Sequence, residues 1–521
     1  MRTLTYILIG WCLCFAYAYG EGEDKEKARI KPIVADDFDD IVNNFGYLLK
    51  GVRRVVWILD QSPSMEDDIV EVRRRIDKWL EDIDPVTQVG IIVFSQKPQV
   101  LLPLTKDRAA IKAAFEKYKT QNSSQENVYA AITEAMTMLP GKESSAILVA
   151  TDETGDDDKH LAVVLRECAA RKLFFYALTP HASFGNKVWK WAETDFKAKS
   201  TKTYQSCNGP ESFTPEALFN FHFVQRTNWT TRNAPEDSRR WAIDAGWAPF
   251  GLHVLAEVTQ GRIYELKNDT LQLATSIDEK KRSRYAPDLD VQNILQNIQR
   301  TPWRLAVQQV ETNWTKNFRD IQRVFVGAGK QSFLAGCARQ MPVIQANTRV
   351  VDNVLEQLAA ALKNKQGGRS STESQDSIPH LRWRANLELA YASASVARFH
   401  LHQIVADFAR FKNPNYELPG AGENLFGYLL DCNSDGTFGT DVLSGTPDAQ
   451  GFYDMLDAAE YSKALTLDQM RTQVECALAV VIANHLDTPW SNMANNLKHM
   501  LGSYEPRAVR LGDWSHGSGN K

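Results

Sequence analysis

Cysteine is scarce in this chain, with seven in 521 residues. Two of them lie in an apolar stretch at the N-terminus. The other five are odd in number and irregularly spaced: Cys168, Cys207, Cys337, Cys432 and Cys476. This spacing matches neither a disulfide framework nor a zinc site. One or two disulfide bonds among these cysteines remain an alternative, but the sequence does not indicate which cysteines would pair.

An excess of one charge sign is also missing, since the net charge is only -4. The chain therefore has no general attraction for nucleic acid or for an anionic membrane. The sequence contains no glycine-rich phosphate loop and no Gly-x-Ser-x-Gly elbow, so neither motif points to an enzyme class. With 43% hydrophobic residues, its length is sufficient for two or three domains.

Long hydrophobic runs are absent apart from one short stretch at the N-terminus. Arg2 precedes the apolar run Leu4–Phe15, and Ala16-Tyr17-Ala18 fits a small-x-small cleavage rule. This pattern predicts a signal peptide over residues 1–18. The alternative is an uncleaved anchor, but the run is short for a membrane span. After cleavage we expect no integral membrane span, and a secreted, periplasmic or cell-envelope protein.

After a charged segment at residues 19–49, an alternating β/α pattern predicts one domain over residues 50–270. Its apolar runs predict strands buried on both faces; these are Val55–Leu59, Val89–Phe94, Ala146–Ala150, Leu173–Leu178 and Arg262–Leu266. Helical periodicity separates most of them. The expected fold is therefore α/β, with a doubly wound, mainly parallel sheet.

An aromatic-rich insertion at residues 181–244 interrupts this pattern. Its rings are expected either to form a small satellite core or to line a partner surface. Beyond it we predict a linker at 271–300, a mainly α-helical domain at 301–505 and a tail at 506–521, without further strands. Thr301-Pro302-Trp303 and Thr488-Pro489-Trp490 both have the pattern of a helix start.

Oxygen-bearing side chains follow two of the predicted strands. Asp60, Ser62 and Ser64 come directly after the first strand, and Asp152 follows Ala146–Ala150. Ligands in α/β sheets sit at the carboxyl ends of strands. Carboxylates and hydroxyls are hard donors that suit Mg²⁺ better than zinc or copper. The sequence therefore predicts a metal-binding loop at this edge.

Asp60-x-Ser62-x-Ser64 and Asp152 resemble the metal-ion-dependent adhesion site of the von Willebrand factor A family. The likeness covers about residues 50–270. It implies a doubly wound sheet that binds Mg²⁺, or alternatively Ca²⁺ or Mn²⁺, through these residues. It also implies a protein ligand whose acidic side chain completes the metal's coordination.

The chain departs from the family's pattern at the second loop. Counting back from Ala131-Ile132, Glu126 occupies the place where the family has threonine. Pro63 and Glu153 also stand where glycine is common. Either the site is degenerate and holds no metal, or Glu126 coordinates the ion. In the second case the added negative charge weakens attraction for a partner's carboxylate.

The expected function is a secreted, adhesion-type protein-binding module and not an enzyme. Glu126-Asn127-Val128 and Asn484-His485-x-x-Thr488-Pro489-Trp490 are also similar to secreted bacterial von Willebrand A proteins with a helical C-terminal region. One alternative is a metal-assisted hydrolase with Glu126 or Asp152 as base, although no obvious nucleophile–base pair accompanies them. Another alternative is a structural module with a vestigial metal site.

A second metal motif is weaker. Asp431-Cys432-Asn433-Ser434-Asp435-Gly436 imitates the start of a calcium loop, but Val442 replaces the glutamate expected at position twelve. An Asx- and glycine-rich turn is the favoured interpretation.

Overall fold

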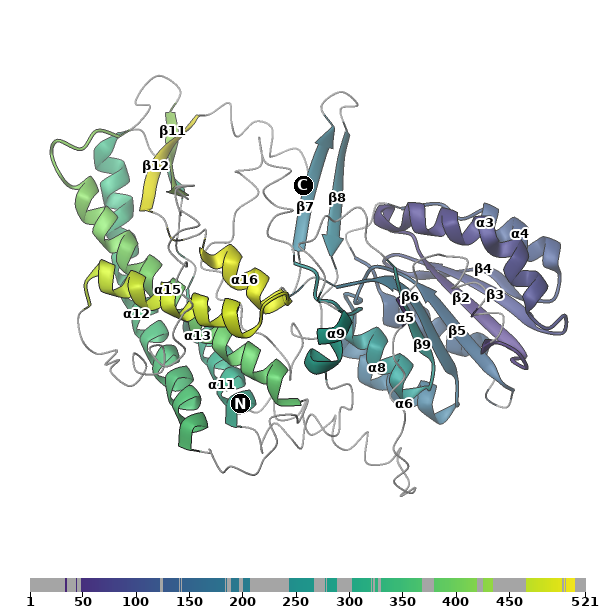
Figure 1. Cartoon of the computed structure of the whole chain (residues 1–521). Coiled ribbons are helices and arrows are strands. Elements are labelled where there is room, and N and C mark those ends of the chain that lie inside the picture. Colours follow the sequence, from purple (N-terminus) through teal and green to yellow (C-terminus); the bar gives the residue numbers. More distant parts are fainter. Residues whose placement is uncertain are drawn as a thin grey trace. The chain divides into compact units, whose positions relative to one another are not determined.

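The chain divides into two compact units in the computed structural model (Figure 1). The first unit comprises residues 1–213, 244–273 and 288–297, and the second comprises 214–243, 274–287 and 298–521. The structure describes residues 33–34, 44, 48–121, 125–139, 141, 143–182, 184, 189–195, 200–206, 243–266, 277, 279–287, 302–319, 321, 324–326, 329–367, 379–418, 425–433, 465–498, 501 and 503–510. The predicted signal peptide lies outside these residues.

The first unit is built on a seven-stranded sheet of order β1-β9-β6-β5-β2-β3-β4. Its strands are β1 (Ile33–Val34), β2 (Arg54–Asp60), β3 (Gln88–Phe94), β4 (Pro98–Thr105), β5 (Ser145–Ala150), β6 (Phe174–Pro180) and β9 (Arg262–Leu266). All neighbouring pairs in this sheet are parallel except β3 and β4. The predicted α/β fold class is confirmed. The short β1 and the edge strand β4 were not predicted.

Helices cover both faces of this sheet (Figure 1). The helices are α3 (Glu66–Asp82), α4 (Arg108–Glu116), α5 (Val128–Met138), α6 (Leu161–Ala170) and α8 (Phe250–Val258). On the α3 and α4 side, the Trp57 ring lies edge-on to Trp79 at 5.6 Å and to Phe115 at 5.9 Å. Because β2 is buried on both faces, it reads as a continuous apolar run.

Few parts of the insertion are described. Strands β7 (Trp189–Asp195) and β8 (Ser200–Ser206) pair as an antiparallel hairpin. Residues 207–242, which carry many of its aromatic rings, lie outside the described residues. Whether these rings form a satellite core or a partner surface stays a prediction.

The second unit is mainly helical, as predicted. Its longer helices are α11 (Pro302–Asn317), α12 (Lys330–Gly367), α13 (Pro379–Phe411), α15 (Leu467–Asn484) and α16 (Pro489–Lys498). Both Thr-Pro-Trp triplets mark a helix start, since α11 begins at Pro302 and α16 at Pro489. A short helix α9 (Glu279–Arg282) and a 3₁₀ turn η5 (Ser283–Tyr285) also belong to this unit.

The expectation of no strands beyond the first domain was wrong. Strands β10 (Val324–Val326), β11 (Leu425–Asn433) and β12 (Ser503–Arg510) form an antiparallel sheet. A short apolar run such as that in β11 cannot be told from a buried helical segment by periodicity alone. The calcium-loop motif starts in β11, where Asp431–Asn433 are extended and paired with β12. Its residues 434–436 lie outside the described part.

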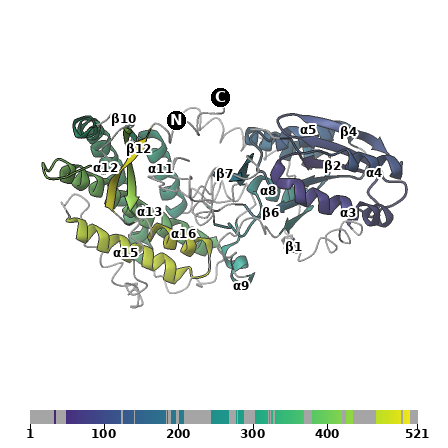
Figure 2. The ribbon, with the colours of Figure 1, turned by 90° about the horizontal axis from the view of Figure 1, so that it is seen from above.

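Helix α13 is the central element of the second unit. Figure 2 shows it with α11, α12, α15 and α16 around it. Trp383, Leu387 and Tyr391 have the spacing of one helical face, and they are buried. However, residues 382–401 of this helix are almost all buried, including Arg382 and Glu388. Burial on every side explains why polar groups of α13 must find partners inside the unit.

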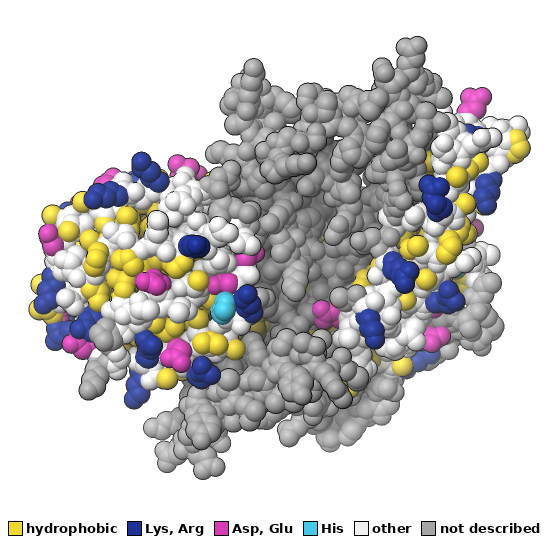
Figure 3. Space-filling model, turned by 180° about the vertical axis from the view of Figure 1, so that it is seen from behind, with side chains coloured by type: hydrophobic (Ala, Val, Ile, Leu, Met, Phe, Trp, Pro, Cys, Tyr) yellow, Lys and Arg dark blue, Asp and Glu magenta, His cyan; other side chains and the backbone are white. Residues whose placement is uncertain are grey.

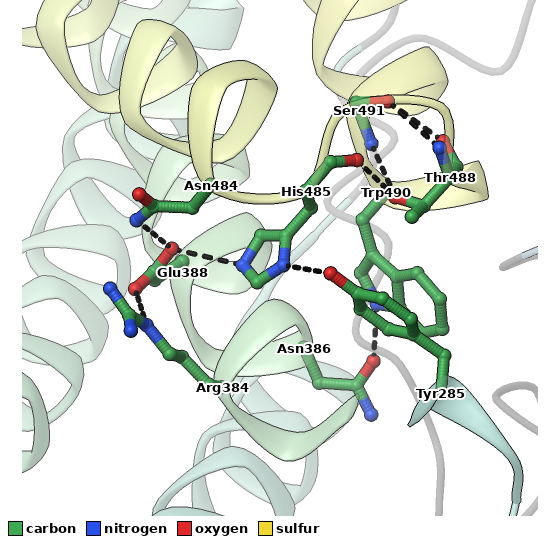
Figure 4. Close-up of polar contacts among 9 residues, drawn as sticks. All are labelled: Tyr285, Arg384, Asn386, Glu388, Asn484, His485, Thr488, Trp490 and Ser491. Carbon is green, nitrogen blue, oxygen red and sulfur yellow. Dashed lines mark hydrogen bonds and ion pairs between the residues drawn. The ribbon is translucent and has the colours of Figure 1, made fainter. Parts of the chain in front are cut away.

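Glu388 has three such polar contacts (Figure 4). Its carboxylate accepts hydrogen bonds from Arg384 Nε at 2.6 Å, Asn484 Nδ2 at 3.0 Å and His485 Nε2 at 3.1 Å. Nδ1 of His485 lies 2.9 Å from the hydroxyl of Tyr285. A neutral His485 protonated on Nε2 satisfies both neighbours, donating to Glu388 and accepting from the hydroxyl.

Glu388→Ala should lower the free energy of unfolding of the second unit by about 3 kcal/mol. The substitution leaves the donors of the half-buried Asn484 and the buried His485 without their acceptor. The matched control is Glu475→Ala, which removes a partly exposed pair with Arg471 and should change stability by less than about 1 kcal/mol. Urea denaturation of both variants measures the difference, and equal midpoints would contradict this role for Glu388.

Candidate metal centre

The loop after β2 is folded around the carboxylate of Asp60. This side chain is fully buried, and its Oδ1 accepts a hydrogen bond from Ser62 N at 2.8 Å. Backbone bonds fix the loop on both sides, because Gln61 N donates to Phe94 O at 2.9 Å and Gln121 N donates to Gln61 O at 2.7 Å. The turn therefore presents its serine hydroxyls in a defined direction.

Asp152 reaches the same loop from the neighbouring strand. β2 and β5 are parallel neighbours that pair Leu59 with Ala150, so their carboxyl ends meet at one edge. Ser62 Oγ donates to Asp152 Oδ1 at 3.5 Å, and Ser64 Oγ donates to Ser62 Oγ at 3.1 Å. The structure thus brings Asp60, Ser62, Ser64 and Asp152 together. Ser64 and Asp152 are partly exposed, whereas Asp60 is not.

Thr151 belongs to this cluster and was not predicted from the sequence. Its Oγ1 donates to Asp60 Oδ2 at 2.6 Å and accepts from Glu153 N at 3.0 Å. The Tyr118 hydroxyl also donates to the Asp60 carbonyl. Both side chains orient Asp60 from inside the protein. The one sequence signal for Thr151 is its place beside Asp152 at a strand end.

Glu126 lies just before α5, in a loop tied to the segment after Asp152. Its backbone N donates to Asp156 Oδ2 at 3.1 Å, and Asp156 N donates to the Glu126 carbonyl at 2.8 Å. The carboxylate of Asp157 caps α5 by accepting from Tyr129 N and Ala130 N. Glu126 is 5% exposed, so its side chain is enclosed at this edge.

The carboxyl groups of the cluster share one electrostatic environment. Burial, followed by the charge of Asp152, raises the pKa of Asp60 to about 7. Burial likewise raises the pKa of Asp152 to about 6, against an opposing hydrogen bond from Ser64. For Glu153, burial and then the charges of Asp152, Glu126 and Asp60 raise the pKa well above its usual range. Glu153 is therefore a further acidic member that the sequence reading left out of the site.

A cation would relieve this mutual repulsion, and the donors fit a hard divalent ion. They are carboxylate and hydroxyl oxygens, the ligands that Mg²⁺ and Ca²⁺ prefer. Within the described ranges, no three acidic, histidine or cysteine side chains are placed to hold a metal by themselves. An ion here would therefore depend on the hydroxyls of Ser62 and Ser64, with water completing its shell.

Comparison with known proteins identifies the fold around this loop. The family model of the von Willebrand factor type A domain matches residues 55–155. A search of curated proteins gave no significant match.

Solved structures give partial likenesses. A conserved hypothetical protein BatB from Bacteroides thetaiotaomicron is 16% identical, with 42% of this chain and 92% of that chain covered and a TM-score of 0.27. Proximal thread matrix protein 1 from the mussel byssus, with a zinc-occupied MIDAS motif, is 14% identical over 25% of this chain and 36% of that chain, with a TM-score of 0.23. A von Willebrand factor type A protein from Catenulispora acidiphila is 13% identical over 25% of this chain and 33% of that chain, with a TM-score of 0.22.

The matched residues span β2 to the loop after β5, and so contain Asp60, Ser62, Ser64, Glu126 and Asp152. The parallel strands, the covering helices and the motif at the sheet edge agree with this match. The chain therefore contains a von Willebrand factor type A domain.

Proposed function

We propose that the first unit is a protein-binding module that holds Mg²⁺ or Ca²⁺ at the Asp60 loop and contacts its ligand through that ion. The observation that carries the proposal is the hydrogen-bonded set of Asp60, Ser62, Ser64 and Asp152. Asp60 is buried and shapes the loop, while Ser64 and Asp152 are reached by solvent. An ion bound there would keep a coordination position open to a partner.

Binding is favoured over catalysis by the surroundings of the loop. Among the described residues, no histidine or cysteine side chain is hydrogen-bonded to Asp60, Ser62, Ser64 or Asp152. Carboxylates without such a neighbour lack the nucleophile–base pair of a hydrolase. The hydroxyls that do contact them, from Thr151 and Tyr118, are buried and serve to orient Asp60.

The proposed place of action is the secreted fraction or the cell envelope, after removal of residues 1–18. In the described part of the chain, no helix has both the length and the apolar character needed to cross a membrane. The described surface seen in Figure 3 mixes basic, acidic and apolar side chains. This mixture agrees with the net charge of -4 and with a protein partner.

Capture of a partner tests this proposal. The full chain, immobilised, would be exposed to the secreted or envelope fraction of its source with either Mg²⁺ or EDTA. We expect a partner that is retained with Mg²⁺, released by EDTA and not retained by a Ser62→Ala/Ser64→Ala double variant. A partner that binds equally in EDTA and to the double variant would show that the metal loop is not the contact.

Glu126→Ala should weaken Mg²⁺ and Ca²⁺ binding by about tenfold or more, because it removes one negative charge from the enclosed cluster. Its matched control is Glu134→Ala, in the helix α5 that follows Glu126 but outside the cluster, which should leave affinity unchanged. Calorimetric titration measures both. Equal or tighter binding by Glu126→Ala would show that this glutamate does not support the ion.

A further inference from the structure

His181 joins two carboxylates at the place where the insertion leaves and re-enters the sheet. It follows directly on β6, and its Nδ1 lies 2.9 Å from Asp244 Oδ2, 63 positions along the chain. Its Nε2 lies 3.0 Å from Glu265 Oε2 in β9. Carboxylates that are ionised only accept hydrogen bonds, so both ring nitrogens must donate. The imidazolium form of His181 meets this requirement.

The contact is enclosed. The Glu265 side chain is fully buried, and those of His181 and Asp244 are 15% and 14% exposed. Two carboxylates brought together in such a place require a compensating positive charge. Burial alone would lower the pKa of His181, but the charges of Glu265 and Asp244 and their hydrogen bonds raise it to about 10.

Other described groups also face the two carboxylates. Backbone amides of Ala248 and Gly246 donate to Glu265 and Asp244, respectively. His253 Nε2, from α8, stands 3.5 Å from Glu265 Oε1, too long for a strong hydrogen bond. In the part of the chain that is described, no three acidic, histidine or cysteine side chains could hold a metal. Among these described contacts, His181 is the group that bonds to both Asp244 and Glu265, and its proton carries a positive charge between them.

The backbone of the same residues closes the base of the insertion. Ala182 N donates to Trp247 O at 2.9 Å, and Ala245 N donates to Ala182 O at 2.9 Å. The two ends of the insertion are thus bonded to each other beside the imidazolium. Glu265 pairs with Thr179 in the parallel β6–β9 ladder, close to the carboxyl ends of both strands. These ends lie at the same sheet edge as the Asp60 loop, since β2, β5, β6 and β9 are parallel.

We propose that His181 is an ionic clamp that closes the neck of the insertion and fixes it to β9. Here the neck means residues 181–182 and 244–248. His181 acts as a positioning residue: it determines where the insertion leaves the edge that carries the candidate metal loop. The clamp does not depend on metal binding, so it can be tested separately from the proposed function.

The test compares His181→Gln, His181→Arg and the control His160→Gln, a substitution of an exposed histidine. Hydrogen exchange of the full chain at pH 7 reports on the Ala182 and Ala245 amides. We expect exchange about tenfold faster in His181→Gln, which loses the charge, and near wild-type rates in the control. His181→Arg keeps the charge and several donors, so it should recover much of the protection. Equal exchange in His181→Gln and the wild type would overturn the proposal.

A pH series provides a readout that simple packing would not give. The folded pKa of His181, about 10, lies above its ordinary value of 6.5. Its stabilising contribution is therefore complete below pH 6.5 and is lost as pH rises towards 10. The melting-temperature gap between wild type and His181→Gln should shrink over that range, while the gap between His181→Arg and His181→Gln should not. A wild-type gap that stays constant from pH 6.5 to 10 would contradict the clamp.

Discussion

An Asp60→Ala variant should bind Mg²⁺ or Ca²⁺ about a hundredfold more weakly than the wild type. Asp60 accepts from the Ser62 amide and from the Thr151 hydroxyl, so its carboxylate sets the geometry of the loop. Without it the serine hydroxyls lose their fixed direction, and the cluster loses a negative charge. Calorimetric titration of the full chain with each ion measures the change.

The control for this prediction is Asp67→Ala, an exposed carboxylate in the first turn of α3. It lies a few residues beyond the loop and should leave the affinity nearly unchanged. A loss of metal affinity can be distinguished from a loss of folding. Burial and the charge of Asp152 raise the pKa of Asp60, which means that its ionised form is unfavourable without a cation. The variant should therefore stay folded in EDTA, and a well-folded Asp60→Ala protein with wild-type metal affinity would contradict the assignment.

Gly261→Ala should destabilise the first unit by about 3 kcal/mol. A Cβ at this position would stand 1.7 Å from the carbonyl oxygen of Phe175 and 2.6 Å from its carbonyl carbon. Both atoms belong to the backbone of β6, so no side-chain rotation relieves the clash. The substitution must push β9 away from β6 where the two strands begin to pair.

Gly141→Ala is the matched control, because nothing lies within 4 Å of a Cβ placed there. Its stability should stay within about 1 kcal/mol of the wild type. Chemical denaturation followed by a probe in the first unit separates the two variants. A Gly261→Ala protein as stable as the control would mean that β6 and β9 are not held as closely as the structure has them.

The strands of the first unit were predictable because β2, β3 and β5 are buried on both faces and appear as continuous apolar runs. The edge strand β4 gives no such signal, since it alternates irregularly between exposed and half-buried residues and contains Pro98 and Pro103. The turn at Gln260-Gly261, between α8 and β9, gives its two residues different roles. Gln260 adopts the left-handed conformation, with φ of 56°, whereas Gly261 permits the close approach of β6.

Part of the candidate site could be predicted, because four of its residues lie at or just after the end of a strand. Asp60 ends β2, Ser62 and Ser64 follow it, and Asp152 follows β5; the adjacency of β2 and β5 brings them together. Thr151 was not predicted because it is a single buried hydroxyl that belongs to no sequence motif. The contacts of His181 and of Glu388 were not predicted for a related reason. Apart from Arg384, their partners lie 63 to 97 positions away in the chain, and pairing over such distances leaves no local periodicity.

The central claim is that the Asp60 loop binds a divalent ion, and titration of the full chain with Mg²⁺ by calorimetry tests it most directly. We expect saturable binding of about one ion per chain that is abolished in the Ser62→Ala/Ser64→Ala double variant. The hydroxyls of both serines are needed because acidic side chains alone do not surround a common point among the described residues. Absence of saturable binding, or identical binding by the double variant, would contradict the claim.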